Sequence, residues 1–207
     1  MARTRRAANL ARQGTEGSRA IPGIITRGIW SPLANRTYRG LLFGSAVSNL
    51  GSMIQVVGAG WLMTQLTTSP VLVALVQSSN TLPMMVLALV AGVLADGFDR
   101  RRLMLGALLF MSLVSAVLAA LAYAGALTPL LLLAFTFMLG AGMAIYSPAW
   151  QASLGDIVTK ADLSPAVTLN TMAFNMMRSI GPAGGGLLVA VAGAATAFLL
   201  NAISYLP

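Results

Sequence analysis

The sequence contains no cysteine and no histidine, and only 9% of its 207 residues are charged. Without cysteine or histidine, disulfides, thiolate metal sites, imidazole acid–base catalysis and histidine-containing catalytic triads are excluded. No nucleophile paired with a base, metal-ligand cluster or cofactor loop is evident, so we expect no enzyme, no metal and no cofactor. A soluble domain is about 25% charged, whereas 57% of this chain is hydrophobic. The composition therefore indicates a membrane protein.

The formal net charge of +8 is concentrated near the N-terminus, because eight of the 13 Lys and Arg residues precede Gly40. Residues 1–38 contain no apolar stretch long enough for the core of a signal peptide, so we interpret them as a basic cytoplasmic tail. Nucleic-acid binding by such a tail would be unspecific, and adhesion to anionic lipid explains the same arginines with fewer assumptions. We therefore expect a lipid bilayer as partner and no nucleic acid.

Three stretches almost free of charge occupy most of the remaining chain: 40–95, 103–155 and 163–207. Each of the first two is long enough for two membrane spans of about 20 residues and has turn-forming residues near its midpoint. The third, which only Arg178 interrupts, divides at 193–195 into a fifth span and a sixth that is truncated at Pro207. We expect an all-α membrane protein, with a transmembrane unit at 39–207 whose six spans lie at about 41–66, 71–95, 103–124, 130–149, 166–192 and 196–207.

Charged loops alternate with uncharged turns along this pattern. The tail and the segments 96–102 and 156–162 carry charge, whereas the three intervening turns carry none. The positive-inside rule then predicts a cytoplasmic N-terminus in a multi-pass protein of the plasma (inner) membrane. A soluble helical bundle does not fit such long uncharged stretches, but a protein of four or five spans with a re-entrant tail remains an alternative.

Polar side chains recur at helical spacing in the first two spans, at Ser45, Ser48, Asn49, Ser52 and Gln55 and then at Gln77 and Asn80. Such a face either packs against another helix, because small residues permit close approach and amides bond across helices, or lines an aqueous cavity. On the second interpretation, the candidate substrate pathway consists of Asn49, Gln55, Gln77, Asn80, Asn175 and Arg178.

Arg178 is the only charge deep inside an expected span, where a charge costs about 2.5–3.5 kcal/mol. No acidic residue of the chain lies at comparable depth, so its partner would be a bound anion, a carboxylate in a second half of the protein, or backbone carbonyls and water. Thr171, Phe174 and Asn175 lie one and two turns earlier on the same face, which makes an anionic or catechol-like solute chemically reasonable.

The loop 92–102 joins the second and third spans and reads Gly-Val-Leu-Ala-Asp-Gly-Phe-Asp-Arg-Arg-Arg. It resembles the signature of the major facilitator superfamily at this place, Gly-x-Leu-Ala-Asp followed by an arginine cluster, although Gly97 replaces a usual arginine. Arginines after a span are also ordinary topology signals. The resemblance implies a latch in which Asp96 closes the cytoplasmic side against a helix of the second half. The implied gate residues are Gly92, Asp96, Asp99, Arg100, Arg101 and Arg102.

Several segments after Trp30, such as 48–51, 60–64, 147–152 and 197–202, resemble bacterial exporters related to the enterobactin exporter. The expected fifth span also resembles a Gly-Pro-x-x-Gly-Gly motif of drug-exporting facilitator antiporters. Because proline bends a helix and glycine permits close packing, this motif is either a rocking point or simply a kinked packing helix. Its residues are Gly181, Pro182, Gly185 and Gly186.

The resemblance implies the N-terminal six-helix half of a secondary active exporter, which moves a siderophore-like anion or a drug by alternating access. Protons as the coupling ion would follow from the family alone, because Gly140-Ala141-Gly142 stands where proton-coupled members have an arginine. One alternative is a transport-incompetent membrane fragment or scaffold that lacks the second half. Another is a six-span unit that dimerises into a complete pathway.

Overall fold

The computed structural model describes residues 28–206, apart from the side chains of 88–91 and 93–96. Most of the expected basic tail and the side chain of Asp96 thus lie outside the described residues. The secondary structure of the described part is a short 3-10 helix, η1 (Ser31–Ala34), and five α-helices: α2 (Arg36–Leu66), α3 (Pro70–Gly97), α4 (Arg100–Tyr123), α5 (Pro129–Ile157) and α6 (Leu163–Ser204). All five are long and apolar enough to cross a membrane, so the all-α membrane class is confirmed.

Local side-chain chemistry sets where three of these helices begin. The Asn35 side chain accepts hydrogen bonds from the first backbone N–H groups of α2, and the Asp99 side chain does the same for α4. Thr128 caps α5, where Pro129 occupies the first turn and needs no N–H partner. These caps satisfy donors that a helix end leaves unpaired, so the charged loop at Asp99 has a structural role besides any role in gating.

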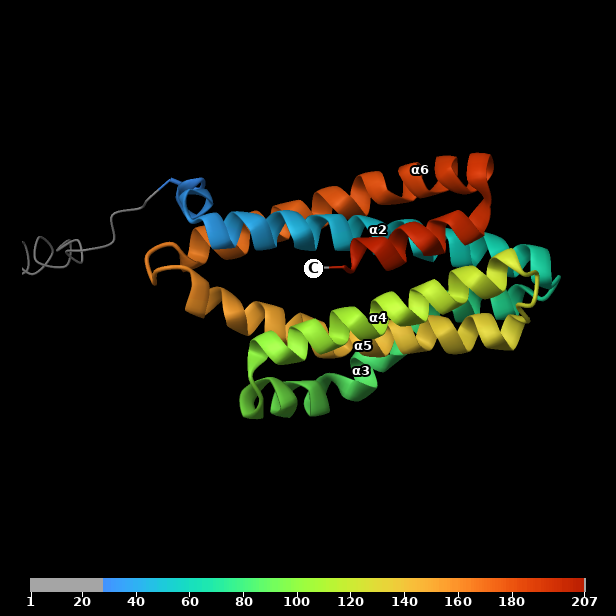
Figure 1. Cartoon of the computed structure of the whole chain (residues 1–207), viewed down its shortest axis with the longest axis horizontal. Coiled ribbons are helices and arrows are strands. Elements are labelled where there is room, and N and C mark those ends of the chain that lie inside the picture. The colour runs from blue at the N-terminus through green and yellow to red at the C-terminus, as the bar shows by residue number, and fades with distance from the viewer. Residues whose placement is uncertain (1–27, 207) are drawn as a thin grey trace, which may run out of the picture.

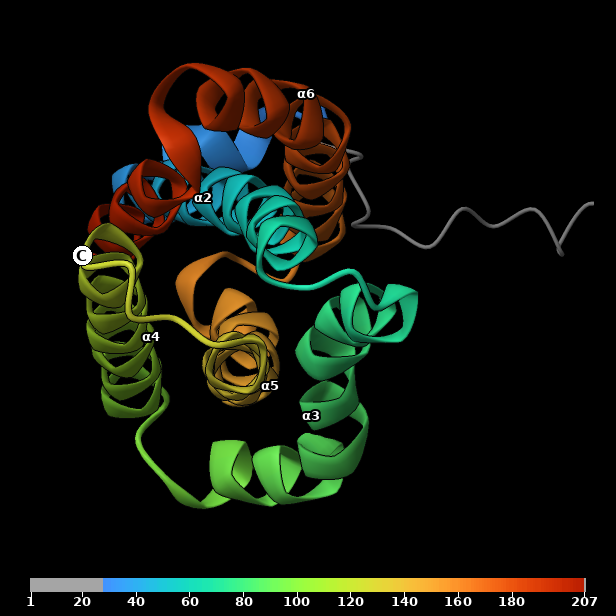
Figure 2. The same cartoon turned by 90° about the vertical axis from the view of Figure 1, so that its right-hand side faces the viewer.

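The helices run side by side along the long axis of the molecule (Figure 1). The main packing pairs are α2 with α6, α3 with α5, α4 with α5, and α4 with α6. Viewed end-on, α5 lies between α3 and α4 and below α2, while α6 covers the far side of α2 (Figure 2). The contact between α5 and α6 is small and includes the apolar cluster of Leu154, Ala166 and Leu169 near the loop that joins them.

The chain reverses direction within α6, at Gly193. Its φ of 81° and ψ of 165° are non-helical and belong to a region that glycine enters without steric cost. The segment 194–204 then folds back into the bundle, where it approaches α2 and α4 (Figure 1). The break lies where the sequence divides the expected fifth and sixth spans, and the returning segment is shorter than the roughly 20 residues a span requires.

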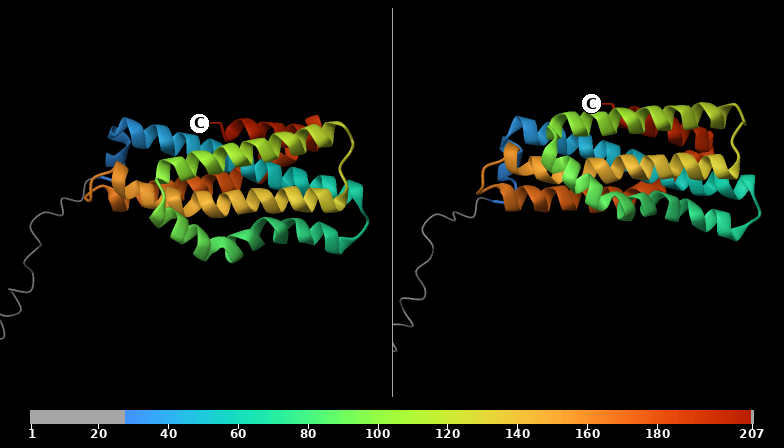
Figure 3. Two further views of the ribbon diagram at one scale, coloured as in Figure 1. Left: turned by 60° about the horizontal axis from the view of Figure 1, so that its bottom comes forward. Right: turned by 90° about the horizontal axis from the view of Figure 1, so that it is seen from below.

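The loops of the bundle gather at two ends (Figure 3), and the two ends differ in charge. The loop between α3 and α4, the loop between α5 and α6, and η1 lie at one end, where Asp99, Arg100 and Asp156 are found. The uncharged turns after α2 and α4 lie at the opposite end, as does the reversal at Gly193. The alternation read from the sequence therefore corresponds to two ends of one bundle.

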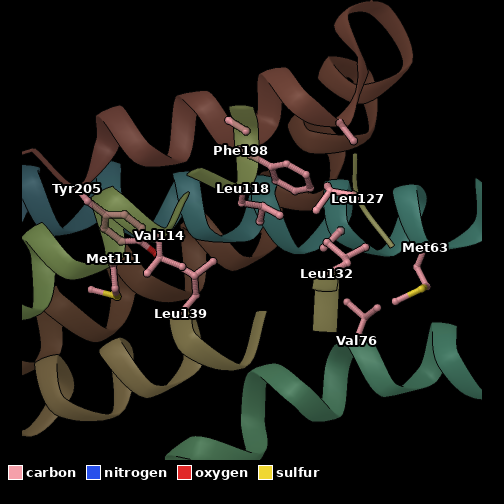
Figure 4. Packing of buried hydrophobic residues seen from close by; sticks show 13 residues of the cluster. Met63, Val76, Met111, Val114, Leu118, Leu127, Leu132, Leu139, Phe198 and Tyr205 are labelled. Atoms are coloured by element: carbon pink, nitrogen blue, oxygen red, sulfur yellow. The ribbon is translucent and has the colours of Figure 1, made fainter. Parts of the chain in front are cut away.

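The main apolar cluster joins all five long helices (Figure 4). Phe198 from the returning segment of α6 lies near Leu118 of α4, and Met63 of α2 and Val76 of α3 belong to the same cluster. Phe198, Leu118 and Met63 are fully buried. Because lipid is as apolar as these side chains, close packing rather than escape from water stabilises such a cluster in a membrane.

Candidate functional site

A cavity of about 530 Å³ lies between α2, α3, α5 and α6. This volume is within the range of about 300–1,000 Å³ that is typical of small-molecule sites. Hydroxyl and amide groups from all four helices alternate around it with methionine and aromatic side chains. The polar residues that line it are Ser45, Asn49, Ser52, Gln55, Asn80, Ser147, Gln151, Asn170, Thr171 and Asn201.

The six predicted pathway residues fall into two groups. Asn49, Gln55 and Asn80 line the cavity. Gln77, Asn175 and Arg178 do not line it, and all three are exposed on the outside of the described bundle. Gln77 precedes the lining residue Asn80 by three positions and Arg178 follows the lining residue Phe174 by four, so the edge of the cavity separates residues about one turn apart on the same helix.

Arg178 keeps the isolated position that the sequence indicates. Within residues 28–206 it has neither a hydrogen bond nor an ion pair, and its side chain is exposed. The exposed face of α6 also carries Asn175 and Ser179. Three polar groups on one face are unsuited to lipid tails, so this face needs a polar partner if the helix spans a bilayer.

A buried polar network connects the cavity wall to α4. The Gln55 side-chain oxygen accepts a hydrogen bond from Ser115 at 2.9 Å and another from the Asn201 amide. Ser115 also lies 2.9 Å from the Phe198 carbonyl oxygen. These three side chains are at most 4% exposed and come from α2, α4 and α6. Sequence reasoning missed Ser115 and Asn201, although a lone amide in an apolar segment is a signal for interhelical bonding.

The polar face of α2 both packs against the returning segment of α6 and lines the cavity. Ser48 donates to the Ser204 carbonyl at 2.6 Å and Ser52 shares a 2.8 Å hydrogen bond with the Tyr205 hydroxyl, so these serines fasten the returning segment of α6. Asn49, one residue after Ser48, lines the cavity, and Ser52 belongs to the same wall. The two interpretations of this face left open by the sequence therefore overlap, because Ser52 both packs and lines.

Two aromatic residues of α5 form part of the cavity wall. The rings of Tyr146 and Trp150 lie 6.4 Å apart with their planes within 9° of parallel. The Trp150 indole N–H donates to the Asn170 side-chain oxygen of α6 at 3.2 Å, which adds a hydrogen bond to the small contact between the two helices. Sequence reasoning used Trp150 only as part of a family resemblance and gave neither aromatic residue a role.

The predicted gate loop is anchored to α5. Arg100 donates to the Asp156 carboxylate at 2.7 Å and to the Ala152 carbonyl oxygen at 3.0 Å. Arg102 lies 3.7 Å from Asp99, and the side chains of Arg101 and Arg102 are exposed. Gly92 is partly exposed within α3. The loop therefore lies at the charged end, where Arg100 ties it to α5, Arg102 pairs with Asp99 and Arg101 is exposed.

The predicted helix-bend motif faces α2 with only two of its four residues. A methyl group added to Gly181 would lie 2.5 Å from the Met53 Cβ, and one added to Gly185 would lie 3.0 Å from the Ile54 Cα. Pro182 and Gly186 are exposed instead. Close approach of α6 to α2 thus explains two of the glycines, and no contact explains Gly186.

The chain was compared with protein families and with known proteins. A family model described as "transmembrane secretion effector" matches residues 27–207. The staphyloferrin A transporter of Staphylococcus aureus is 32% identical over 157 residues, which cover 75% of this chain and 40% of that protein. The multidrug efflux pump Tap of Mycobacterium tuberculosis is 28% identical over 173 residues, 80% of this chain and 41% of that protein. No solved structure gives a significant match.

The macrolide efflux protein A of Streptococcus pyogenes is also similar, with 26% identity over 72% of this chain and 36% of that protein. The chain therefore spans about two fifths of the length of the curated relatives it matches. Relatives of this kind are transporters and not enzymes, in keeping with the exclusion of catalytic chemistry above. The family match covers nearly the whole chain, and the chain belongs to the major facilitator superfamily of membrane transporters.

Proposed function

We propose that this chain forms the N-terminal half of a secondary active exporter of small molecules, with the cavity between α2, α3, α5 and α6 as its share of the transport pathway. The observation that carries the proposal is a cavity of about 530 Å³ lined by hydroxyls and amides inside an otherwise apolar helical bundle. Unpaired polar groups are costly in hydrocarbon, so a polar-walled cavity at this place needs water or a ligand. Alternating access would then expose the cavity to each side in turn.

The proposed topology has six spans, with α6 supplying the fifth and the beginning of the sixth. The non-helical backbone at Gly193 and the return of 194–204 into the bundle support this division. The charged end of the bundle would lie in the cytoplasm of a plasma (inner) membrane protein, because positively charged loops stay inside.

The absence of cysteine from this chain makes the topology testable by thiol labelling. In intact cells, a membrane-impermeant maleimide should label a thiol introduced by Thr68→Cys but not one introduced by Lys160→Cys. Permeabilising the cells should make the second thiol reactive. Labelling of Lys160→Cys in intact cells would refute the cytoplasmic placement of the charged end.

We propose a gate at the charged end of the bundle and contacts of α6 with the second half. Asp96 would close the cytoplasmic side against a helix of the second half of the family fold, and Arg100, held by Asp156, would keep the loop in place. Gly181 and Gly185 would allow α6 to move against α2 while staying close to it. Arg178 and Asn175, exposed on α6, would face the second half or a solute bound next to it. Proton coupling rests on the family alone.

The proposed export activity calls for an efflux assay with the complete protein. Cells that express it should accumulate less of at least one siderophore or drug than cells that express an inactive variant, since the relatives' names refer to staphyloferrin A, multiple drugs and macrolides. Asn80→Leu is a suitable cavity variant and Gln77→Leu its control, because Asn80 lines the cavity and Gln77 lies outside it on the same helix. An equal loss of efflux in the two variants, at equal expression, would show that the cavity is not part of the transport pathway.

A further inference from the structure

The wall of the cavity has a composition that favours some chemical groups over others. Its apolar part contains three methionines, the two aromatic residues of α5 and several aliphatic side chains. Its polar part consists of uncharged amides and hydroxyls, and none of the described lining residues carries a charge. An ion that leaves water needs a counter-charge or a dense set of hydrogen bonds. This wall therefore favours an uncharged group.

Tyr146 offers a flat surface in this wall. It is partly exposed, whereas Trp150 is only 5% exposed and lies parallel to it. Because the Asn170 hydrogen bond holds the indole, the two rings keep a common orientation. A planar ring of a ligand can stack on such a surface with an offset, which is the favoured aromatic geometry. The indole and its amide partner thus act as positioning groups behind the contacting ring.

Other residues of the wall suit the edges of a planar ligand. Asn49 and Asn80 belong to α2 and α3 and each offers both a hydrogen-bond donor and an acceptor. Met53, Met84 and Met143 have unbranched, polarizable side chains that adapt to rings of different outline. Amides can therefore pair with carbonyl, amine or hydroxyl substituents while methionines fill the remaining volume.

We propose that this cavity binds an uncharged, planar aromatic part of the transported molecule, stacked on Tyr146 and hydrogen-bonded at its edge by amide side chains. The proposal rests on the proposed export function and adds the chemical class of the ligand. It differs from the anionic solute suggested by Arg178, because that arginine lies outside the cavity.

A matched set of three fluorescent tricyclic probes tests the charge preference: neutral acridone, an anionic acridine carboxylate and the N-methylacridinium cation. Each is loaded into cells that lack other efflux pumps and express the complete protein, and its loss from the cells is followed. We expect saturable export of acridone, with the carboxylate and the cation both exported far more slowly.

Substitutions at two tyrosines test the stacking surface. Tyr146→Leu should raise the half-saturating concentration for acridone roughly tenfold with little change in maximal rate, because it removes the ring–ring contact. Tyr146→Phe should retain the affinity of the parent. Tyr123→Leu is the matched control, since Tyr123 is exposed and bonds Thr196 away from the cavity. Membrane levels are read from a fluorescent tag.

A second measurement does not depend on transport or on Tyr146. A thiol introduced by Asn80→Cys lies in the cavity wall, whereas one introduced by Gln77→Cys lies outside it on the same helix. Acridone should slow maleimide labelling of the first thiol and leave the second unaffected. The carboxylate probe should protect neither thiol.

The outcomes separate this inference from the proposed function. Export of another drug or siderophore without export of acridone, unchanged acridone affinity in Tyr146→Leu, or preferential protection by the carboxylate would each overturn the inference and leave the export function intact. Export of no compound, with no thiol protection, would overturn both. Acridone export that depends on the Tyr146 ring, together with selective protection at position 80, supports the inference.

Discussion

Removing the Gln55 side chain tests how the returning segment of α6 is held in the bundle. Gln55 is 4% exposed, and its oxygen is the shared acceptor for Ser115 and the Asn201 amide. In Gln55→Ala, Ser115 can still donate to the Phe198 carbonyl oxygen, but the Asn201 amide loses its Gln55 acceptor and lies 3.5 Å from the Ser115 hydroxyl. The main consequence is therefore an unsatisfied amide donor on the segment that follows Gly193.

The expected loss of unfolding free energy follows from two known ranges. A buried donor left without its acceptor costs about 1–3 kcal/mol in a protein interior. In membrane proteins, measured couplings between such partners average about 0.6 kcal/mol and reach about 1.7 kcal/mol, because the unfolded segment also finds partners within the bilayer. We therefore expect Gln55→Ala and Asn201→Ala each to lower the free energy of unfolding by about 1–2 kcal/mol. The double variant should lose about 0.6–1.7 kcal/mol less than the sum.

The free energy of unfolding is measured in mixed micelles by titration with a denaturing detergent. The control pair combines Gln55→Ala with Tyr38→Phe, which removes the hydrogen bond from the Tyr38 hydroxyl to the Ala166 carbonyl oxygen. Tyr38 and Gln55 lie 17 residues apart on α2, about 25 Å along the helix, so their effects should add within about 0.5 kcal/mol. Additivity of Gln55→Ala and Asn201→Ala to the same precision would refute the network as a coupled unit.

Two further predictions concern helix packing and the charged end. Gly185→Ala should destabilise the protein by about 1–3 kcal/mol, because its methyl group would press on the Ile54 backbone. Gly186→Ala, with open space around the site, should be neutral or slightly stabilising, and equal losses of melting temperature in the two variants would contradict the packing argument. Arg100→Gln should lower the free energy of unfolding by about 1 kcal/mol or less, because both partners of its ion pair with Asp156 are partly exposed. If Arg100→Gln caused the same loss in a protein that already carries Asp156→Asn, the ion pair would not be its cause.

The sequence predicted the helices better than the site because the two depend on different signals. Spacing between charges and turn residues needs only chain length and hydrophobicity, so the ranges expected at 41–66 and 103–124 agree closely with α2 and α4. The largest deviation is at the C-terminal end of α5, which continues beyond the expected residue 149 to Ile157 and so includes Asp156. The sixth span is the exception, since the described part of the chain contains five helices of sufficient length and a short returning segment inside α6.

Which polar residues line the cavity could not be read from helical periodicity alone. Gln77 and Asn80 both carry amide side chains and lie three residues apart on α3, yet Gln77 is exposed and Asn80 lines the cavity. The difference depends on how far α3 is rotated about its own axis, which its contact with α5 determines. There, the Gly140 backbone lies against the Asn80 carbonyl oxygen and the Pro83 ring. Rotation of this kind is a tertiary property, and no local pattern in α3 encodes it.

The double use of the α2 face limits how the cavity can open. Ser48, Ser52 and Gln55 bond the returning segment of α6, and Asn49 and Gln55 also line the cavity. If this segment moved away from α2, part of the cavity wall and several buried hydrogen bonds would be lost together. Lipid tails offer no replacement hydrogen-bond partners, so this movement would be unfavourable. The contact between α5 and α6 is smaller, and it consists of the Trp150–Asn170 hydrogen bond and an apolar cluster near the loop that joins the two helices, with Leu154, Ala166 and Leu169. We therefore expect α2 and 194–205 to move as one body and the cavity to widen by separation of α5 from α6.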